Sequence, residues 1–441
     1  MRTSLISFPL MRTNRNKTRL ISAERSPFWA GVPRMFATGI AICCCAGIGA
    51  QENSRIQDLE RRLAEQTRKV DALVEQIGEP GMGGMGGDAW YDRFTLGGYG
   101  ETHANFREGS ESGDMLDNHR FVIYAGYAFS DWVTFHSETE IEHSFVDDGN
   151  GYLNIEQMFT DFSMSSSLNF RAGRYLVPVG IINATHEPTT FNGVERPSMA
   201  KYIIPSTWSA DGIGAWGNWG ESMSYQFYVG SGLDGSGFDA TNGLRKGRMK
   251  ERPGINDPGV TGRIDMNPLS DEDLRVGLSF FAGGLDNSNK GEVNGTPGDV
   301  LLVAADFEYS WSRFDLRGVY ATASIDDADK LNAIFAAAPF DGREVAERIT
   351  GYYLEAAAHI MPDGWRTGRL ADADLVAFVR YEDYDTQDKM PVGATANPAG
   401  DRQELTFGFS FFPAANFVIK ADYQVRDGVD DLMNVGVGFT F

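Results

Sequence analysis

The chain has 441 residues, a mean hydropathy of −0.29 and a formal net charge of −22 at pH 7. A polyanion of this size is unsuited to binding nucleic acid, because the phosphates repel it. The length would allow two or three soluble domains, but no long helical periodicity follows residue 78, and no later apolar run approaches the roughly 18 residues of a spanning helix. The composition therefore favours one large all-β unit.

Residues 1–50 are predicted to be an export signal peptide. Seven basic residues precede or flank an apolar stretch that ends at Ala50, and we expect cleavage after this residue. Met11 and Met35 are alternative starts of translation. The three cysteines of the chain stand together at 43–45, outside a lipoprotein pattern. The exported protein is therefore expected to have no disulfide and no thiol chemistry.

Residues 51–78 are predicted to form a coiled-coil oligomerisation helix. Apolar residues recur there at alternating spacings of three and four, which is the a and d pattern of about three heptads. The seam consists of Ile56, Leu59, Leu63, Val70, Leu73 and Ile77, with Gln66 as its one interruption. An amphipathic helix lying on a membrane is the alternative, but the stripe is narrow for that role. A Gly-rich linker follows at 79–90.

Residues 91–441 are predicted to form a 16-stranded antiparallel transmembrane β-barrel. Turn signals divide this part into strands at 92–106, 118–129, 132–143, 153–164, 167–177, 211–220, 223–232, 259–267, 273–284, 299–309, 312–324, 349–361, 373–384, 402–412, 416–426 and 432–441. The connections alternate between tight turns and long polar loops, which is typical of the two ends of an outer-membrane barrel. A soluble sandwich has no reason to keep this parity. The connection 362–372 is long for its place, and the strand 153–164 alternates poorly.

The last strand carries the barrel pattern most clearly. Bulky apolar residues alternate with small or polar ones, so one set is expected to face lipid and the other a wet lumen. The lipid-facing set is Met433, Val435, Val437, Phe439 and Phe441, and the lumen-facing set is Asn434, Gly436, Gly438 and Thr440. An edge strand of a soluble sandwich is the alternative for these ten residues alone.

The third external loop, at about 178–210, is the longest and mixes apolar residues with charges. We expect it to fold inward and narrow a water-filled pore. The candidate residues that line the pore or its constriction are Arg120, Arg171, Arg196, Lys201, Arg263, Arg275, Arg313, Arg317, Arg380, Lys420, Glu187 and Glu195. Rings of Arg or Lys select anions. The arginines have an alternative role as partners of lumen carboxylates, namely Asp265, Asp315, Glu355, Glu382 and Asp422.

No catalytic, cofactor or metal site is recognised in the sequence. His136, Glu138, Glu140 and Glu142 share one strand face, but a hydrated lumen ladder fits this run better than a metal site, since same-face residues stand ~6.6 Å apart. None of the six histidines lies in a nucleophile motif. The acidic external loops are expected to be solvated, with divalent-cation bridging to lipopolysaccharide as the alternative.

Two motifs and the aromatic end carry a family resemblance. The opening strand reads Phe-Thr-Leu-Gly-Gly-Tyr-Gly at 94–100, and Asn-Phe-Arg-Ala-Gly-Arg-Tyr-Leu-Val-Pro-Val-Gly at 169–180 leads into the long loop. With the coiled coil, the linker and the final Phe441, these segments resemble trimeric outer-membrane porins of the phosphate-selective O and P superfamily, in the branch with a short amino-terminal coiled coil. The resemblance implies homotrimers of 16-stranded barrels, each with its own Arg- or Lys-rich anion path.

The chain departs from phosphate-specific members because it is strongly acidic and has few lysines. A phosphate-specific ladder is therefore not expected, and a channel for small organic anions or a less selective porin fits the chain better. We expect an outer-membrane porin for passive diffusion of small hydrophilic solutes, with small anions (phosphate or organic acids) as the preferred class. Its expected partners are outer-membrane lipid and lipopolysaccharide. A structural anchor or adhesin with a plugged barrel is the first alternative, and a barrel hydrolase is the second.

Overall fold

The structure is a computed structural model that describes residues 90–109, 113–143, 152–249, 251–268, 274–287, 295–336 and 343–441. The predicted signal peptide, the coiled coil with its apolar seam, and positions 79–89 of the linker lie outside these ranges. Each of these three assignments therefore stays a prediction.

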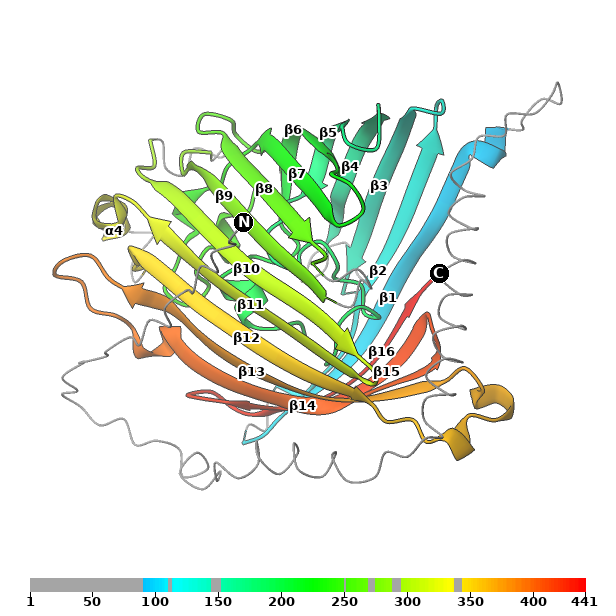
Figure 1. Cartoon of the computed structure of the whole chain (residues 1–441). Coiled ribbons are helices and arrows are strands. Elements are labelled where there is room, and N and C mark those ends of the chain that lie inside the picture. The colour runs from blue at the N-terminus through cyan, green and yellow to red at the C-terminus, as the bar shows by residue number, and fades with distance from the viewer. Residues whose placement is uncertain are drawn as a thin grey trace, which may run out of the picture. The chain divides into compact units, whose positions relative to one another are not determined.

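The described residues form one closed barrel of 16 strands, in which sequence neighbours pair antiparallel and β1 pairs with β16 (Figure 1). The predicted fold class is confirmed. The strands are β1 Phe94–Arg107, β2 Met115–Ala128, β3 Val133–Glu142, β4 Leu153–Ser163, β5 Asn169–Leu176, β6 Ser209–Asn218, β7 Met223–Gly230, β8 Gly259–Met266, β9 Leu274–Gly284, β10 Asp299–Trp311, β11 Phe314–Ile325, β12 Arg348–His359, β13 Asp374–Lys389, β14 Asp401–Ala414, β15 Phe417–Arg426 and β16 Leu432–Thr440.

The barrel closes between its first and last strands. Their register runs from Tyr99 opposite Thr440 to Arg107 opposite Leu432. Beyond this ladder, the Phe441 N–H donates to the Gly98 carbonyl at 2.9 Å, and the Gly98 N–H donates to the Phe441 carbonyl at the same distance. No unpaired strand edge remains in the described barrel, because every strand has two hydrogen-bonded neighbours.

Side chains alternate between the two faces of the wall, as the last strand predicted. In β16, Met433 is 51% exposed, whereas Asn434 is fully buried and faces inward. The same alternation leaves apolar side chains on the outer face of strands around the barrel, including Leu96, Phe121, Ile123, Leu278, Leu301, Val303, Phe407, Phe409, Ile419 and Val437. Among the described residues, no helix has the length and apolarity to cross a membrane.

Exposed tryptophans gather at the end of the barrel that carries the short turns. Trp132 and Trp219 lie in the turns after β2 and β6, and Trp311 ends β10. Trp365 lies in the connection between β12 and β13, at the same end. Tryptophan prefers the boundary between lipid and water, so this distribution fits a barrel that meets an interface there.

Short helices occur within the connections. The α-helices are α3 Met199–Tyr202 and α4 Ala328–Phe335, and the 3-10 helices are η1 Trp90–Arg93, η2 Gly235–Gly237, η3 Arg245–Gly247, η4 Asp363–Trp365, η5 Gly368–Leu370 and η6 Pro398–Gly400. The pair η4 and η5 fills the connection at 362–372, whose predicted length was unusual for the short-turn end.

The strand pairing shifts register between β1 and β2, β3 and β4, β12 and β13, and β14 and β15, and the shifts in β2 and β4 each leave one extra residue. In β2, the partner of Glu101 is Arg120 but the partner of His103 is Asp117, so β2 bulges between them. In β4, Glu138 pairs with Gln157 and Thr139 with Ile155, which leaves an extra residue at 156. The second bulge explains why the segment 153–164 alternated poorly in the sequence.

Candidate channel constriction

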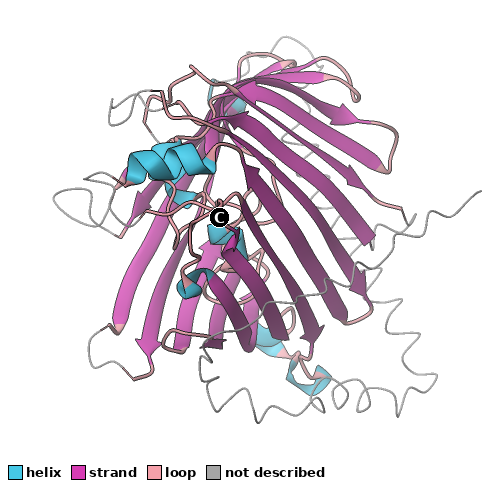
Figure 2. Ribbon diagram, turned by 90° about the vertical axis from the view of Figure 1, so that its left-hand side faces the viewer, coloured by secondary structure: helices cyan, strands magenta, loops and turns pink. Residues whose placement is uncertain are grey.

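The loop between β5 and β6, residues 177–208, lies inside the barrel and is the candidate functional site. Figure 2 shows loops and short helices enclosed by the strands of the wall. The loop divides into two parts, which we call the flanks (177–182 and 199–208) and the tip (183–198). The flanks pack in an apolar core, and the tip is held by polar groups of the wall.

The flanks belong to a hydrophobic core that lies inside the barrel near its long-loop end. Val177 and Val179 are fully buried, and the Trp208 ring lies 4.7 Å from the Phe281 ring, centroid to centroid. The core also includes inward side chains of β9 to β13 and apolar residues of other connections. Those residues are Leu233, Phe238, Leu244, Leu285, Leu331 and Phe335.

Predicted lumen cations bind backbone carbonyls of the loop. The donors come from strands all around the wall, so the loop is attached on several sides. The bonds are Arg263 Nη1 to Gly180 at 3.0 Å, Arg120 Nη2 to His186 at 2.8 Å, Arg317 Nη1 to Thr190 at 3.2 Å, Lys420 Nζ to Phe191 at 2.8 Å, and Arg380 Nη1 and Nη2 to Asn192 at 3.2 Å and Glu195 at 3.3 Å.

Carboxylates of the wall accept hydrogen bonds from the same loop. The Asp422 Oδ2 accepts from the Val194 N–H at 2.6 Å, and the Glu382 Oε2 accepts from the Met199 N–H at 2.9 Å. The Asn192 side-chain amide donates to Glu355 Oε1 at 3.0 Å. Donors and acceptors of the wall therefore both fix the loop, as buried backbone groups require.

Glycines of the last strand make room for the loop. Gly436 and Gly438 face inward, and a Cβ atom at Gly438 would lie only 2.4 Å from the Cβ of Pro188. A Cβ at Gly436 would lie 3.0 Å from a methyl carbon of Val194. The tip approaches β16 so closely that a larger side chain at Gly438 would displace it.

The inward arginines also pair with carboxylates, the alternative role considered in the sequence. Arg171 binds Asp161 through two bonds of 2.7 and 2.8 Å, and the same bidentate geometry joins Arg263 to Asp306. The other pairs are Arg120 with Glu101, Arg275 with Glu308 and Asp265, Arg317 with Glu355, and Arg380 with Glu382 and Glu355. The wall is therefore close to balanced in charge around these groups.

A buried ion pair fixes the start of the tip. His186 places Nδ1 3.0 Å from the Asn183 carbonyl and Nε2 3.0 Å from Glu156 Oε2. A carbonyl only accepts, so both ring nitrogens carry protons when Glu156 is ionised, and the ring is an imidazolium. Burial lowers the pKa of His186, which lies outside the strands, but Glu156 outweighs that effect and raises the pKa to about 9.

The other predicted loop residues differ in their surroundings. Glu187 accepts a hydrogen bond from the Tyr124 hydroxyl at 3.1 Å, and Glu195 accepts one from the Asn105 amide at 3.1 Å. Arg196 is half-buried and Lys201 is exposed. Arg313, which strand alternation predicted to face the lumen, lies in the tight turn between β10 and β11. The run beginning at His136 faces inward through Glu138 and Glu140, which are both buried.

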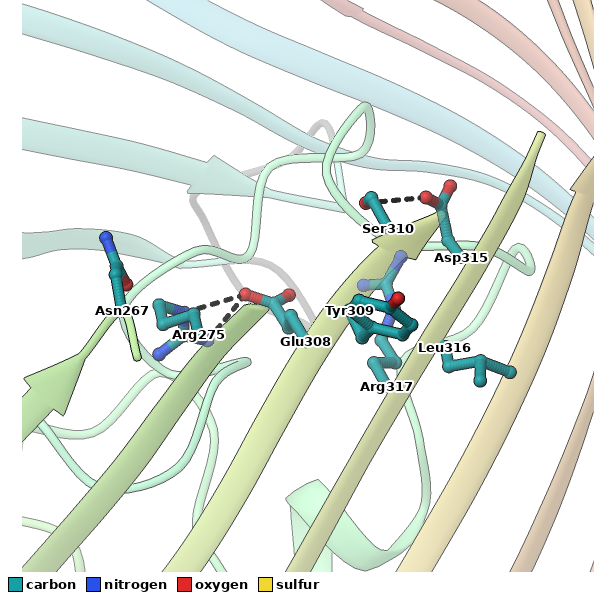
Figure 3. Close-up of a pocket in the computed structure, with 8 residues that line it drawn as sticks. All are labelled: Asn267, Arg275, Glu308, Tyr309, Ser310, Asp315, Leu316 and Arg317. Carbon is teal, nitrogen blue, oxygen red and sulfur yellow. Dashed lines mark hydrogen bonds and ion pairs between the residues drawn. The ribbon is translucent and has the colours of Figure 1, made fainter. Parts of the chain in front are cut away.

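A polar cavity of about 430 Å³ opens near the short-turn end of β9 to β11 (Figure 3). Arg275 binds Glu308 beside it, and the Ser310 hydroxyl donates to Asp315 at 2.7 Å. Its lining comprises Asn267, Arg275, Glu308, Tyr309, Ser310, Asp315, Leu316 and Arg317. Positively and negatively charged side chains both line this cavity, so it forms a hydrated vestibule rather than a path lined by cations alone.

Comparison with known proteins identifies one curated relative, an uncharacterized protein of Aquifex aeolicus (strain VF5). It is 33% identical over 346 residues, which cover 76% of each chain. The chain belongs to the family of that protein. No family model matches the sequence.

Solved structures with the same fold are outer-membrane channels and porins. OmpF of Salmonella typhi, solved in complex with daunomycin, has a TM-score of 0.54 at 13% identity and covers 79% of this chain and 97% of its own. The outer-membrane channel DcaP of Acinetobacter baumannii has a TM-score of 0.50 at 13% identity, with the same coverages. An anion-selective porin from Comamonas acidovorans has a TM-score of 0.50 at 15% identity and covers 79% and 99%. These likenesses establish the porin fold.

The sequence did not identify the contribution of the other long connections to the interior. Leu233, Phe238 and Leu244 follow β7, and Leu331 and Phe335 lie on α4, yet all five pack in the same core as the flanks. Large apolar residues in the segments between predicted strands could have indicated this packing, because external loops of a pore are otherwise polar.

Proposed function

We propose that this protein is an outer-membrane porin that gives passive diffusion of small hydrophilic solutes past a fixed constriction. The observation that carries the proposal is the loop 177–208, held inside a closed 16-stranded barrel by wall residues on several sides. The apolar outer face and the tryptophans at the short-turn end support insertion in a membrane. No enzymatic activity is proposed.

The selectivity that we propose is a weak preference for small anions, such as phosphate or organic acids. The candidate cations that pair with inward carboxylates or with the loop face the interior, which supports an anion path. Most of them also bind a carboxylate or a loop carbonyl, so little unpaired positive charge is available to a permeant ion. Membership in the phosphate-selective O and P superfamily and the homotrimer are proposed on the sequence resemblance alone, as are the signal peptide, the coiled coil and the contacts with lipopolysaccharide.

A plugged barrel that serves as an anchor or adhesin is the second candidate. The apolar core formed by several loops favours it, because this core occupies interior space near the long-loop end. Ion conductance distinguishes the two functions.

The test uses the purified full-length protein in a planar bilayer under a potassium chloride gradient. A porin gives stepwise conductance, grouped in threes if it is a trimer, and the sign of the reversal potential reports whether cations or anions permeate more readily. Liposome swelling with sugars of increasing size then measures the width of the constriction. Folded protein that gives neither current nor swelling would reject the porin and support the anchor.

A further inference from the structure

Three histidines gather at the long-loop end of the barrel, on one side of the mouth. His103 lies on β1, His119 on β2, and His143 directly follows β3. The rings of His103 and His119 stack with their centroids 4.7 Å apart, and the rings of His119 and His143 meet edge to face at 5.4 Å. Imidazole rings from three consecutive strands therefore lie in contact at one place.

Two of these histidines converge on a single carboxylate. The Asp117 Oδ2 atom lies 3.1 Å from His119 Nδ1 and 2.8 Å from His143 Nδ1. Candidate ligand atoms of the three residues all lie within 4.8 Å of one another. Asp117, His119 and His143 are only partly buried, with side-chain exposures of 12%, 30% and 33%. An ion from solution can therefore reach them.

The convergence depends on two irregularities of the backbone. The bulge in β2 inserts one residue opposite Thr102, which turns His119 to the face where Asp117 and His103 already point. His143 has a positive φ of 56°, an unusual conformation for a residue other than glycine, and its N–H donates to the His119 carbonyl at 3.0 Å. Regular alternation would put His119 on the face opposite its neighbour Arg120, whereas the bulge lets Asp117, His119 and Arg120 all face inward. Local irregularities that together aim three side chains at one point indicate a function for the group.

His103 is not a member of the ligand set. Its Nε2 lies 3.2 Å from Glu101 and its Nδ1 lies 3.3 Å from Glu195, so both ring nitrogens have carboxylate neighbours. It instead connects the cluster to the loop tip, since Glu195 belongs to that tip. The cluster thus offers two imidazole nitrogens and one carboxylate, and it leaves further coordination positions open to water or solute.

We propose that Asp117, His119 and His143 form a binding site for a divalent transition metal ion, with Zn²⁺ as the ion best suited to two imidazoles and a carboxylate. The ion would lie between Asp117 Oδ2 and the Nδ1 atoms of His119 and His143, in place of the present hydrogen bonds, and each imidazole would bind it in the neutral form. This site lies at the mouth of the barrel and is separate from the proposed constriction. It does not depend on whether the barrel conducts.

The experiment uses full-length protein from which a chelator has removed bound metal. Isothermal titration calorimetry with zinc chloride then measures the affinity and the number of ions bound per chain. One Zn²⁺ per chain is expected for the wild type. The variant His143→Asn removes one ligand while asparagine tolerates the positive φ, and we expect its affinity to fall at least about tenfold, the loss of one ligand interaction. The matched control is His136→Asn, which removes an inward histidine of β3 outside the cluster and is expected to bind zinc as the wild type does.

X-ray absorption at the zinc edge keeps the proposal testable if His143→Asn does not fold. The proposed site predicts two imidazole nitrogens at about 2.0–2.1 Å with oxygen ligands and no sulfur. Sulfur in the coordination shell would place the ion at the cysteines at 43–45 and overturn the proposal. Substoichiometric binding by the wild type, or equal affinity of the wild type and His143→Asn, would also overturn it.

Discussion

The flanks and the tip of the loop 177–208 are held inside the same barrel by different interactions, apolar packing for the flanks and polar contacts for the tip. The flanks bury Val177, Val179 and Trp208 in an apolar core, whose stability changes little with pH or salt. The tip is attached to the wall through its own charged residues, such as His186 and Glu195, whose contribution depends on their protonation. The flanks therefore keep the loop inside the barrel, whereas the tip determines its position within the lumen.

Truncation of a flank residue should have the largest effect. Trp208→Ala removes a buried ring that packs on Phe281, and we expect it to lower the free energy of unfolding by about 3–5 kcal/mol. Urea unfolding in detergent micelles, followed by far-UV circular dichroism, measures this loss. Trp365→Ala is the matched control, because Trp365 is 60% exposed outside the core. Equal losses in the two variants would contradict the assignment of the flanks.

Removal of the buried charge in the tip should have a smaller effect on stability. His186→Gln retains a donor for Glu156 but no positive charge, and we expect a loss of about 1.5–3 kcal/mol. The same urea experiment at pH 7 measures it. The reversal potential should shift toward cations at the same time, since the negative charge of Glu156 is then uncompensated. A variant with wild-type stability and potential would contradict a structural role for this pair.

The pH dependence of the tip should follow from the raised pKa of His186. Because the folded-state pKa of about 9 exceeds the ordinary value of about 6.5, the stabilisation is complete below pH ~6.5 and is lost as the pH rises through about 9. The wild type should therefore lose more stability between pH 7 and pH 10 than His186→Gln does. Subtracting the stability change of His186→Gln from that of the wild type removes the contribution of the other titrating groups. Parallel pH profiles of the two proteins would refute the prediction.

Changes in the vestibule should have the smallest effect on stability. Arg275 and Glu308 pair beside the cavity of Figure 3 and are partly exposed, so either substitution by glutamine should cost about 0–1 kcal/mol. The two variants are controls for each other in a bilayer. Arg275→Gln should shift the reversal potential toward cation permeation and Glu308→Gln toward anion permeation. Shifts of the same sign would indicate that the cavity does not border the ion path.

The sequence predicted the strands well because alternation and turn signals act locally. All 16 predicted strands overlap their observed counterparts, and the largest difference is in β13, which continues to Lys389. The outward and inward sets of the last strand were also recovered. A period of two residues is sufficient for these features, since it depends only on the residues of one strand.

The arrangement of the interior was less predictable, since it depends on contacts between distant residues. Alternation placed Arg380 inside the barrel, but nothing local could pair it with Glu382, Glu355 and the loop carbonyls at once. The bulge of β2 and the positive φ of His143 break the alternation itself. The alternation that predicted the strands therefore could not predict these two irregularities.

The pairing of β1 with β16 bears on the order of assembly. The two strands come from opposite ends of the described chain, so their ladder closes the largest loop that this fold contains. Until β16 arrives, β1 presents an open row of backbone donors and acceptors that another chain can occupy. A partly assembled barrel is consequently the form most exposed to aggregation, and contacts such as the stacking of Phe441 on Phe121 protect the chain only after the final seam has formed.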